Sequence, residues 1–281
     1  MKLASMSSCR NMSDIVKLLF IGDIVAKPGR EITRRVLPEL ARTHDIDLVI
    51  ANVENAAGGN GITRDVGENL RDCGIQVMTT GNHVWDKKEA LSYILDEPRL
   101  LRPANYPKGV PGQGHFLART TQGIPIGVVN VMGRIFMNPL DNPFNVVEND
   151  IATLRSTEEK CIILVDMHAE ATSEKKAMGW HLDGKVTAVV GTHTHVQTAD
   201  ETILPNGTAY ITDVGMTGPH DSIIGVNVKP ALRRFIDGLP ARFDTATGNP
   251  RLNAVVISAD INTCHATSIE RIDLSEEDVE P

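Results

Sequence analysis

Cysteine and aromatic side chains are scarce in this chain. Its 281 residues include 4 cysteines, and aromatic residues make up 4% of the sequence. Cys9, Cys73, Cys161 and Cys264 lie far apart and form no C-x-x-C pair, so neither a zinc ribbon nor a disulfide framework is indicated. We therefore expect reduced thiols and a cytoplasmic location.

Long apolar runs and an excess of positive charge are also lacking. No stretch approaches the roughly 18 apolar residues that a membrane span needs, and residues 1–14 lack the continuous apolar segment of a secretion signal. The formal net charge is -8 and the pI is about 5.6, which argues against an anionic membrane or a stable nucleic-acid partner. A small phosphate ester held by metal ions remains compatible with this charge.

No Pro/Gly/Ser-rich linker, internal repeat or low-complexity tract divides the sequence. We expect a single domain over residues 15–274, preceded by a flexible extension at 1–14 and followed by a flexible acidic tail at 275–281. Composition identifies no interface, so homo-oligomerisation stays open.

Five short aliphatic runs, each followed by a polar cluster, are the main pattern of the sequence. The runs cover residues 18–21, 48–53, 75–80, 162–167 and 186–190. Such runs are typical of buried parallel strands. In an open α/β sheet, ligands bind outside the carboxyl ends of these strands, so we expect the polar clusters to converge there.

Helical and antiparallel segments complete the predicted α/β fold. We expect helices at about 31–43, 64–73, 86–95, 145–156, 173–182 and 230–236, and further strands at 100–105, 209–212, 253–259 and 265–272. Two β-like runs between residues 116 and 131 flank a Thr-Gln-Gly turn, which predicts a hairpin. Another turn is expected at 217–220.

The polar clusters supply oxygen and imidazole ligands, which hard and borderline divalent metals prefer. Seven residues form this set: Asp23, Glu54, Asn55, Asn82, His168, His193 and His195. They are too many for one tetrahedral zinc and suit two metals roughly 3.5–4 Å apart that share a carboxylate and serve phosphate-ester hydrolysis. In an extended segment, residues two apart point to the same side, so both His193 and His195 are able to face the metals.

Each of these acids or histidines, taken singly, is more often a solvated or hydrogen-bonded structural residue. The alternative is therefore a Rossmann-like domain with incidental polar loops. Five independent placements at predicted strand ends weigh against that alternative.

Six ordered motifs resemble those of the calcineurin-like metallophosphoesterases, and more closely their YmdB-type branch. They are G-D-I-V at 22–25, E-N-A-A-G-G at 54–59, T-G-N-H-V-W-D at 80–86, R-P-A-N-Y-P at 102–107, H-A-E-A-T-S-E-K at 168–175 and G-T-H-T-H-V-Q-T-A-D-E at 191–201. The similarity extends from about residue 17 to residue 226, which is most of the chain.

The resemblance implies a metallophosphoesterase-type α/β sandwich of mixed sheets flanked by helices. It also implies a two-metal centre, most often filled by iron with manganese as an alternative, and hydrolysis of cyclic nucleotides, 2',3'-cyclic monophosphates in particular. Carried over by motif, Asp23, Glu54, Asn55 and His195 hold the first metal, and Glu54, Asn82, His168 and His193 hold the second. Glu54 is then the bridge.

The same resemblance implies that a metal-bound hydroxide attacks phosphorus while His83 acts as the general acid. The alternative for His83 is a hydrogen-bonded residue that orients a neighbouring ligand. Two further functions remain open. One is a phosphomonoesterase or protein phosphatase, and the other is a regulatory protein whose metal site only stabilises the fold. A 3',5'-cyclic substrate also remains open.

Several neighbours of the site have two interpretations. Asp166 and Glu170 flank His168. In one interpretation one of these acids orients the histidine, and in the other both acids are solvated loop residues. Ala26 and Val53 stand where the branch commonly has glycine, so a positive φ at either position predicts local strain.

Overall fold

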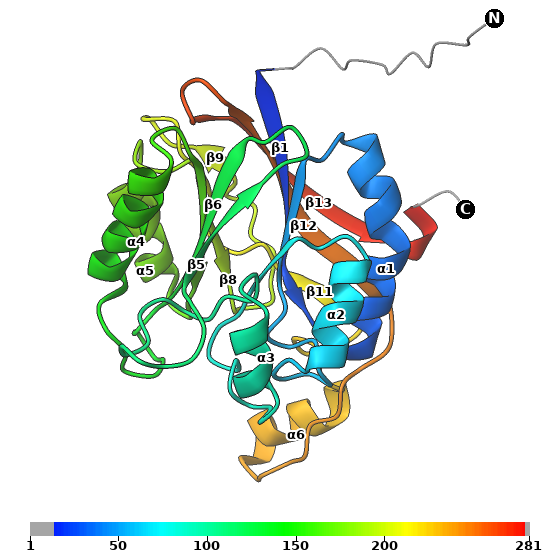
Figure 1. The fold of residues 1–281 in the computed structure, drawn as a ribbon. Helices are drawn as coiled ribbons and strands as arrows, with labels where there is room; N and C mark the ends of the chain where they lie inside the picture. Colours follow the sequence, from blue (N-terminus) through cyan, green and yellow to red (C-terminus); the bar gives the residue numbers. More distant parts are fainter. Residues whose placement is uncertain (1–13, 279–281) are drawn as a thin grey trace, which may run out of the picture.

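Residues 14–278 are described by the computed structural model. Two mixed β-sheets pack face to face, and helices cover their outer faces (Figure 1). The expected α/β sandwich of mixed sheets flanked by helices is confirmed.

The first sheet contains seven strands in the order β2-β11-β12-β1-β3-β4, with β13 beside β12. Their bounds are β1 (Ile15–Ile21), β2 (Asp23–Ile24), β3 (Leu48–Asn52), β4 (Val77–Thr79), β11 (Met216–Pro219), β12 (Pro250–Asp260) and β13 (Ala266–Ser275). Strands β1, β3 and β4 are parallel, whereas β12 is antiparallel to both β1 and β13.

The second sheet contains six strands in the order β5-β6-β7-β8-β10-β9. Their bounds are β5 (His115–Arg119), β6 (Pro125–Met132), β7 (Ile162–His168), β8 (Ala188–Thr192), β9 (Thr202–Ile203) and β10 (Ala209–Ile211). Strands β6, β7, β8 and β10 are parallel. The predicted hairpin is confirmed, because β5 pairs antiparallel with β6.

Apolar side chains fill three layers between these elements. The helices are α1 (Ala26–Thr43), α2 (Arg64–Asp72), α3 (Ala90–Asp96), α4 (Pro143–Thr157), α5 (Thr172–Leu182) and α6 (Val228–Asp237). Helices α1 to α3 pack on the first sheet and α4 and α5 on the second. Phe20 and Ile50 meet Leu164 and Val190 between the two sheets. Alternating side chains of β1 and β3 thus face the helices or the other sheet.

Two sequence predictions of local structure are wrong. Residues 100–105 form no continuous strand, since Leu100 and Leu101 make only isolated bridges and Pro103 has no N–H to extend a ladder. Residues 217–219, predicted as part of a turn, belong to β11. Its pairing with β2 and β12 supplies long-range hydrogen bonds that override the local turn preference of Gly and Pro.

The C-terminal end of the described chain contacts helix α1. Strand β13 runs to Ser275, and Glu276–Asp278 form a 3₁₀ turn in which Glu276 lies 2.5 Å from Arg35 of α1. Residues 1–13 and 279–281 of the expected extensions lie outside the described residues. No helix in the described part of the chain is long and apolar enough to cross a membrane.

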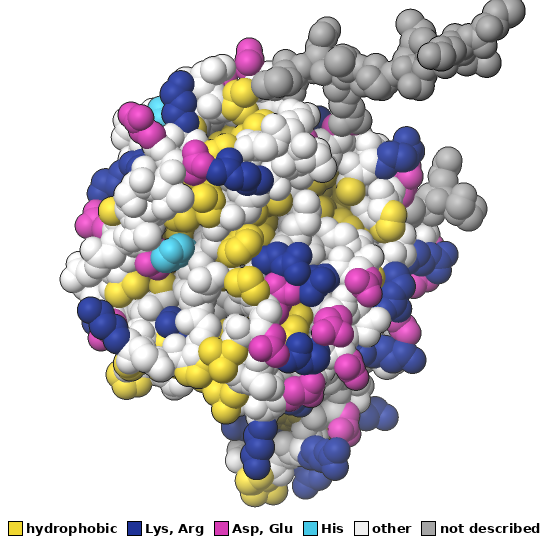
Figure 2. All heavy atoms as spheres, viewed as in Figure 1, with side chains coloured by type: hydrophobic (Ala, Val, Ile, Leu, Met, Phe, Trp, Pro, Cys, Tyr) yellow, Lys and Arg dark blue, Asp and Glu magenta, His cyan; other side chains and the backbone are white. Residues whose placement is uncertain are grey.

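Helix α6 projects from the lower end of the molecule (Figure 1). Ala231 is its one buried residue, while Phe235 and Ile236 are 80% and 76% exposed. In Figure 2, hydrophobic and basic side chains lie together at this end.

Candidate metal centre

The carboxyl ends of parallel strands from both sheets meet at one edge of the sandwich and place all seven predicted ligands there. Asp23 begins β2, and His168 is the last residue of β7. Glu54 and Asn55 follow β3, Asn82 follows β4, and His193 and His195 follow β8. Four of the seven, Asp23, Glu54, Asn55 and His168, are buried. Residues up to 172 positions apart in the chain therefore form a single cluster.

One group of donor atoms surrounds Nε2 of His168. Oδ1 of Asn82 lies 3.0 Å from it, Oε1 of Glu54 lies 3.1 Å away, and Nδ1 of His193 lies 3.1 Å away. One donor atom from each of Glu54, His168 and His193 lies within 4.8 Å of the others, an arrangement able to hold a metal ion. These four residues are the set that the resemblance assigns to the second metal.

A second group lies on the other side of Glu54. Nε2 of His195 is 3.2 Å from the Asn55 amide and 3.8 Å from Oδ1 of Asp23. The same amide lies 3.4 Å from Oε1 of Glu54. Glu54 therefore contacts residues of both groups, as a bridging carboxylate must.

The path of the chain through His193 and His195 differs from the extended segment that the sequence predicts. Strand β8 ends at Thr192, and His193 and His195 have φ of 99° and 63°. Non-glycine residues with positive φ are uncommon and cluster at functional sites. The two imidazoles thus converge through a bent, left-handed backbone, and strand alternation plays no part.

Burial and charge shift the pKa values of the ligands in opposite directions. Burial favours the neutral Glu54 carboxyl, but the His168 charge outweighs it and lowers the pKa of Glu54 to about 2. Burial likewise opposes a charged His168, yet Glu54 raises the pKa of His168 to about 9. Burial, aided by His168, lowers the pKa of His193 to about 3, and burial raises the pKa of Asp23. The two carboxylates of this cluster, Asp23 and Glu54, are both buried, and a cation placed between them would stabilise their charged forms.

The residues present fit metal ions on independent grounds. Oδ1 of Asp23 is buried and accepts no hydrogen bond from any of the described residues. Such an atom is rare in proteins because an unsatisfied buried acceptor costs free energy, and coordination removes that cost. The mixture of carboxylate, amide and imidazole donors also suits borderline metals.

A hydrogen-bonded chain behind His168 determines which nitrogen faces the cluster. Thr192 donates its hydroxyl to Asp166 at 2.7 Å, and its oxygen lies 2.8 Å from Nδ1 of His168. Because this hydroxyl proton is used by Asp166, Nδ1 of His168 is the donor and Nε2 faces the ligands. Asp166 is fully buried, and burial raises its pKa to about 6. Of the two interpretations offered for Asp166, the orienting one therefore holds.

The acid on the other side of His168 behaves differently. Glu170 is half-exposed, and its Oε2 lies 3.1 Å from Nε2 of His193. It thus orients the next histidine rather than His168.

A buried ion pair that sequence reasoning missed supports the segment 193–195. Nζ of Lys175 lies 2.6 Å from Oδ2 of Asp213, and both side chains are buried. The same carboxylate oxygen accepts from the backbone N–H and the hydroxyl of Thr194 at 3.0 and 2.8 Å. The H-A-E-A-T-S-E-K motif contains Lys175, but only the fold reveals its partner.

His83 lies at the accessible side of the cluster. Its backbone N–H donates to Oε2 of Glu54 at 3.1 Å, while its Nδ1 lies 2.8 Å from Oδ2 of Asp86. The ring lines a cavity of about 290 Å³ together with Glu54, Asn55, His193 and His195. The side chain is therefore accessible to a ligand in this cavity.

The strain expected at the substituted glycine positions occurs at one of the two. Ala26 has φ of 51°, in the left-handed region, whereas Val53 is not among the described residues with positive φ. Ala26 donates its N–H to the carbonyl of Asn55 at 2.9 Å. The strained residue therefore supports the backbone of a predicted ligand.

The fold and the donor set define an α/β protein with a candidate metal-binding site at its strand ends. A family model described as YmdB-like protein matches residues 19–272. The chain belongs to this family, and the resemblance seen in its motifs is confirmed.

Individual relatives agree with this assignment. The chain is 48% identical over 257 residues to the 2',3'-cyclic-nucleotide 2'-phosphodiesterase of Bacillus subtilis (strain 168), covering 92% of this chain and 96% of that protein. Among solved structures it is similar to a hypothetical protein from Thermus thermophilus, with TM-score 0.85, 43% identity and coverage of 92% and 99%. A structure described as a novel phosphatase of Mycoplasma pneumoniae has TM-score 0.87, 36% identity and coverage of 94% and 95%.

Proposed function

We propose that this protein is a two-metal phosphodiesterase that hydrolyses 2',3'-cyclic nucleotides. The convergence of Glu54, His168 and His193 donor atoms within 4.8 Å, beside a cavity lined by His83, carries the proposal. The Bacillus relative, named for hydrolysis of 2',3'-cyclic nucleotides, supports this substrate class.

Seven side chains would hold the two metals. Asp23, Glu54, Asn55 and His195 would bind one, and Glu54, Asn82, His168 and His193 the other. Iron is the first candidate and manganese the second, because carboxylate, amide and imidazole donors accept both. Bound metals lower the pKa of water and neutralise charge on the phosphoryl oxygens.

His83 would protonate the leaving group. In the proposed reaction a water molecule releases a proton to solvent and its oxygen bonds to phosphorus, the bond from phosphorus to the ribose 2'-oxygen breaks, and that oxygen takes the proton of His83, which solvent then restores. Nδ1 of His83 contacts Asp86, which leaves Nε2 as the nitrogen able to act on the substrate. Asp86 would orient the ring.

Metal content and turnover, measured on the same anaerobically purified protein, test the proposal. We expect about two metal ions per chain and faster turnover of 2',3'-cyclic AMP than of 3',5'-cyclic AMP or p-nitrophenyl phosphate. His83→Ala should keep its metals and lose roughly 10²- to 10⁴-fold in kcat. His181→Ala is the matched control, because that ring pairs with Glu148 instead of the cluster. Preference for p-nitrophenyl phosphate would indicate a phosphomonoesterase instead.

Glu54→Gln separates this enzyme from a regulatory protein with a structural metal. Loss of the bridging charge should abolish metal retention and turnover while the sandwich remains folded, as followed by circular dichroism. A variant that unfolds when it loses its metal would support the structural role.

A further inference from the structure

We propose that a second cavity beside the metal centre binds the nucleobase of the substrate and selects bases that carry an exocyclic amino group. This inference rests on the proposed function, because it concerns the same substrate. It assigns a role to a part of the molecule outside the predicted ligand set.

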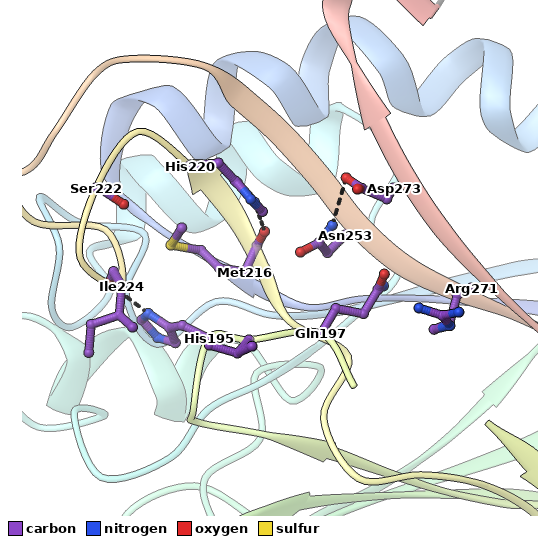
Figure 3. Close-up of a pocket in the computed structure, with 10 residues that line it drawn as sticks. His195, Gln197, Met216, His220, Ser222, Ile224, Asn253, Arg271 and Asp273 are labelled. Carbon is purple, nitrogen blue, oxygen red and sulfur yellow. Dashed lines mark hydrogen bonds between the residues drawn. The ribbon is translucent and has the colours of Figure 1, made fainter. Parts of the chain in front are cut away.

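The cavity has a volume of about 390 Å³ and shares His195 and Ile224 with the cavity of the metal centre. The segment after β8, the region of β11 and strands β12 and β13 surround it (Figure 3). Nδ1 of His195 lies 3.0 Å from the Ile224 carbonyl oxygen, while its Nε2 faces the ligands Asn55 and Asp23. A nucleotide whose phosphate binds at the metals thus has this cavity next to it.

Two side-chain amides present acceptor oxygens in the cavity. Nε2 of Gln197 donates to three backbone carbonyl oxygens at 3.0, 3.3 and 3.2 Å. Nδ2 of Asn253 donates to Asp273 at 3.0 Å. These bonds decide the orientation of both amides, because an amide oxygen cannot donate. Within residues 14–278, no hydrogen bond reaches Oε1 of Gln197 or Oδ1 of Asn253, so both remain available as acceptors (Figure 3).

Apolar groups form part of the wall around these acceptors, beside the polar side chains of His220, Arg271 and Asp273. Met216 is almost fully buried, whereas Val196 and Ile224 are 59% and 54% exposed at the rim. Ile224 has φ of 47°, which is a genuine outlier for a β-branched residue. The strained backbone of Ile224 places its carbonyl oxygen against His195, a predicted metal ligand. It also places the Ile224 side chain at the wall of both cavities. Strain of this kind is retained at sites that position a ligand.

A planar base with an amino group complements this lining. Apolar walls accept the faces of an aromatic ring, and two amide oxygens accept the two N–H groups of an amine. Adenine and cytosine provide such an amine at the edge of the base, whereas hypoxanthine and uracil place a carbonyl there. A carbonyl facing two acceptor oxygens leaves them unpaired, which reduces binding.

Two substrate pairs test the inference without any mutation. We expect KM to be about tenfold lower with 2',3'-cyclic AMP than with 2',3'-cyclic IMP, which corresponds to one hydrogen bond to a buried acceptor. The same order should hold for 2',3'-cyclic CMP against 2',3'-cyclic UMP. Differences in KM with similar kcat indicate a binding subsite. Equal KM values within each pair would overturn the inference.

Val196→Trp tests the location of the subsite, because the indole fills the rim of the cavity. Its kcat/KM for 2',3'-cyclic AMP should fall about tenfold more than that for bis-p-nitrophenyl phosphate, which has no base. Leu95→Trp is the control, since Leu95 is a 67% exposed residue of α3 outside this cavity. An equal loss on both substrates would overturn the location. A metal-loaded wild type that hydrolyses no diester at all would instead refute the proposed function.

Discussion

The hydroxyl of Thr192 donates to the carboxylate of Asp166 at 2.7 Å, and both residues are buried beside the candidate metal ligands. Thr192 is the last residue of β8, and Asp166 lies in the neighbouring parallel strand β7. Their contact determines the hydrogen-bonding role of the hydroxyl and therefore the orientation of His168, which gives a role to the buried carboxylate of Asp166.

Thr192→Val should weaken metal binding while preserving the fold. Valine keeps the shape of threonine but removes the oxygen that faces Nδ1 of His168, so we expect roughly 10- to 100-fold weaker affinity. Competition with a chelator measures it. Thr187→Val is the control, because that buried hydroxyl donates to the Cys264 carbonyl away from the cluster. Equal effects in both variants would contradict the orienting role.

Asp86→Asn should lower kcat and leave metal content unchanged. Its carboxylate contacts Nδ1 of His83 at 2.8 Å, and an amide is a weaker partner that orients the ring less firmly. We expect a decrease of at least about tenfold in kcat with 2',3'-cyclic AMP. Asp86 also accepts from Asn60 at 2.9 Å, so Asn60→Ala controls for loss of that bond alone. An unchanged kcat would show that Asp86 does not assist His83.

Lys175→Met should destabilise the domain by about 3–5 kcal/mol, because it leaves the buried carboxylate of Asp213 without its cation. The loss is measured by urea unfolding. The adjacent Lys176 pairs with Asp200 at 3.3 Å and is 56% exposed, so Lys176→Met should change stability by less than about 1 kcal/mol. Similar values for the two variants would exclude a special role for the buried pair.

Ala26→Gly should change the stability of the domain by less than about 1 kcal/mol. Glycine removes the left-handed penalty of roughly 1–2 kcal/mol, which offsets its extra conformational entropy of roughly 0.5–1 kcal/mol and the loss of one buried methyl group, about 0.8 kcal/mol. Val53→Gly provides the contrast, because this buried residue does not show the positive φ of Ala26. That change should cost at least about 2 kcal/mol through the lost side chain. Thermal unfolding that ranks the two variants in the opposite order would refute the strain argument.

Most helices and strands were predictable from the sequence because their signals are local. Helix α5 at Thr172–Leu182 and the hairpin of β5 and β6 match the expected segments within two residues. Helix α1 begins at Ala26, five residues before the predicted start at 31. Tertiary packing on the first sheet extends it through Pro28, which is tolerated in the first turn.

The candidate site was predictable to a similar extent. Asp23, Glu54 and His168 stand directly at strand ends, so their convergence follows from the general geometry of parallel sheets. The roles of Asp166 and Lys175 were not predictable, since each depends on a contact with a residue 26 or 38 positions away. The assignment of the ligands to two metals stays a prediction.

By itself, the sequence determined most of the order of elements, the chemical set of donors and the family, because hydrophobic periodicity and motifs are properties of short segments. Tertiary structure alone decided which nitrogen of His168 faces the cluster and how His193 and His195 turn toward it. It also brought Gln197 and Asn253 to one cavity. Hydrogen-bond direction and backbone strain depend on distances between segments that are far apart in the chain, and only packing of the two sheets sets those distances.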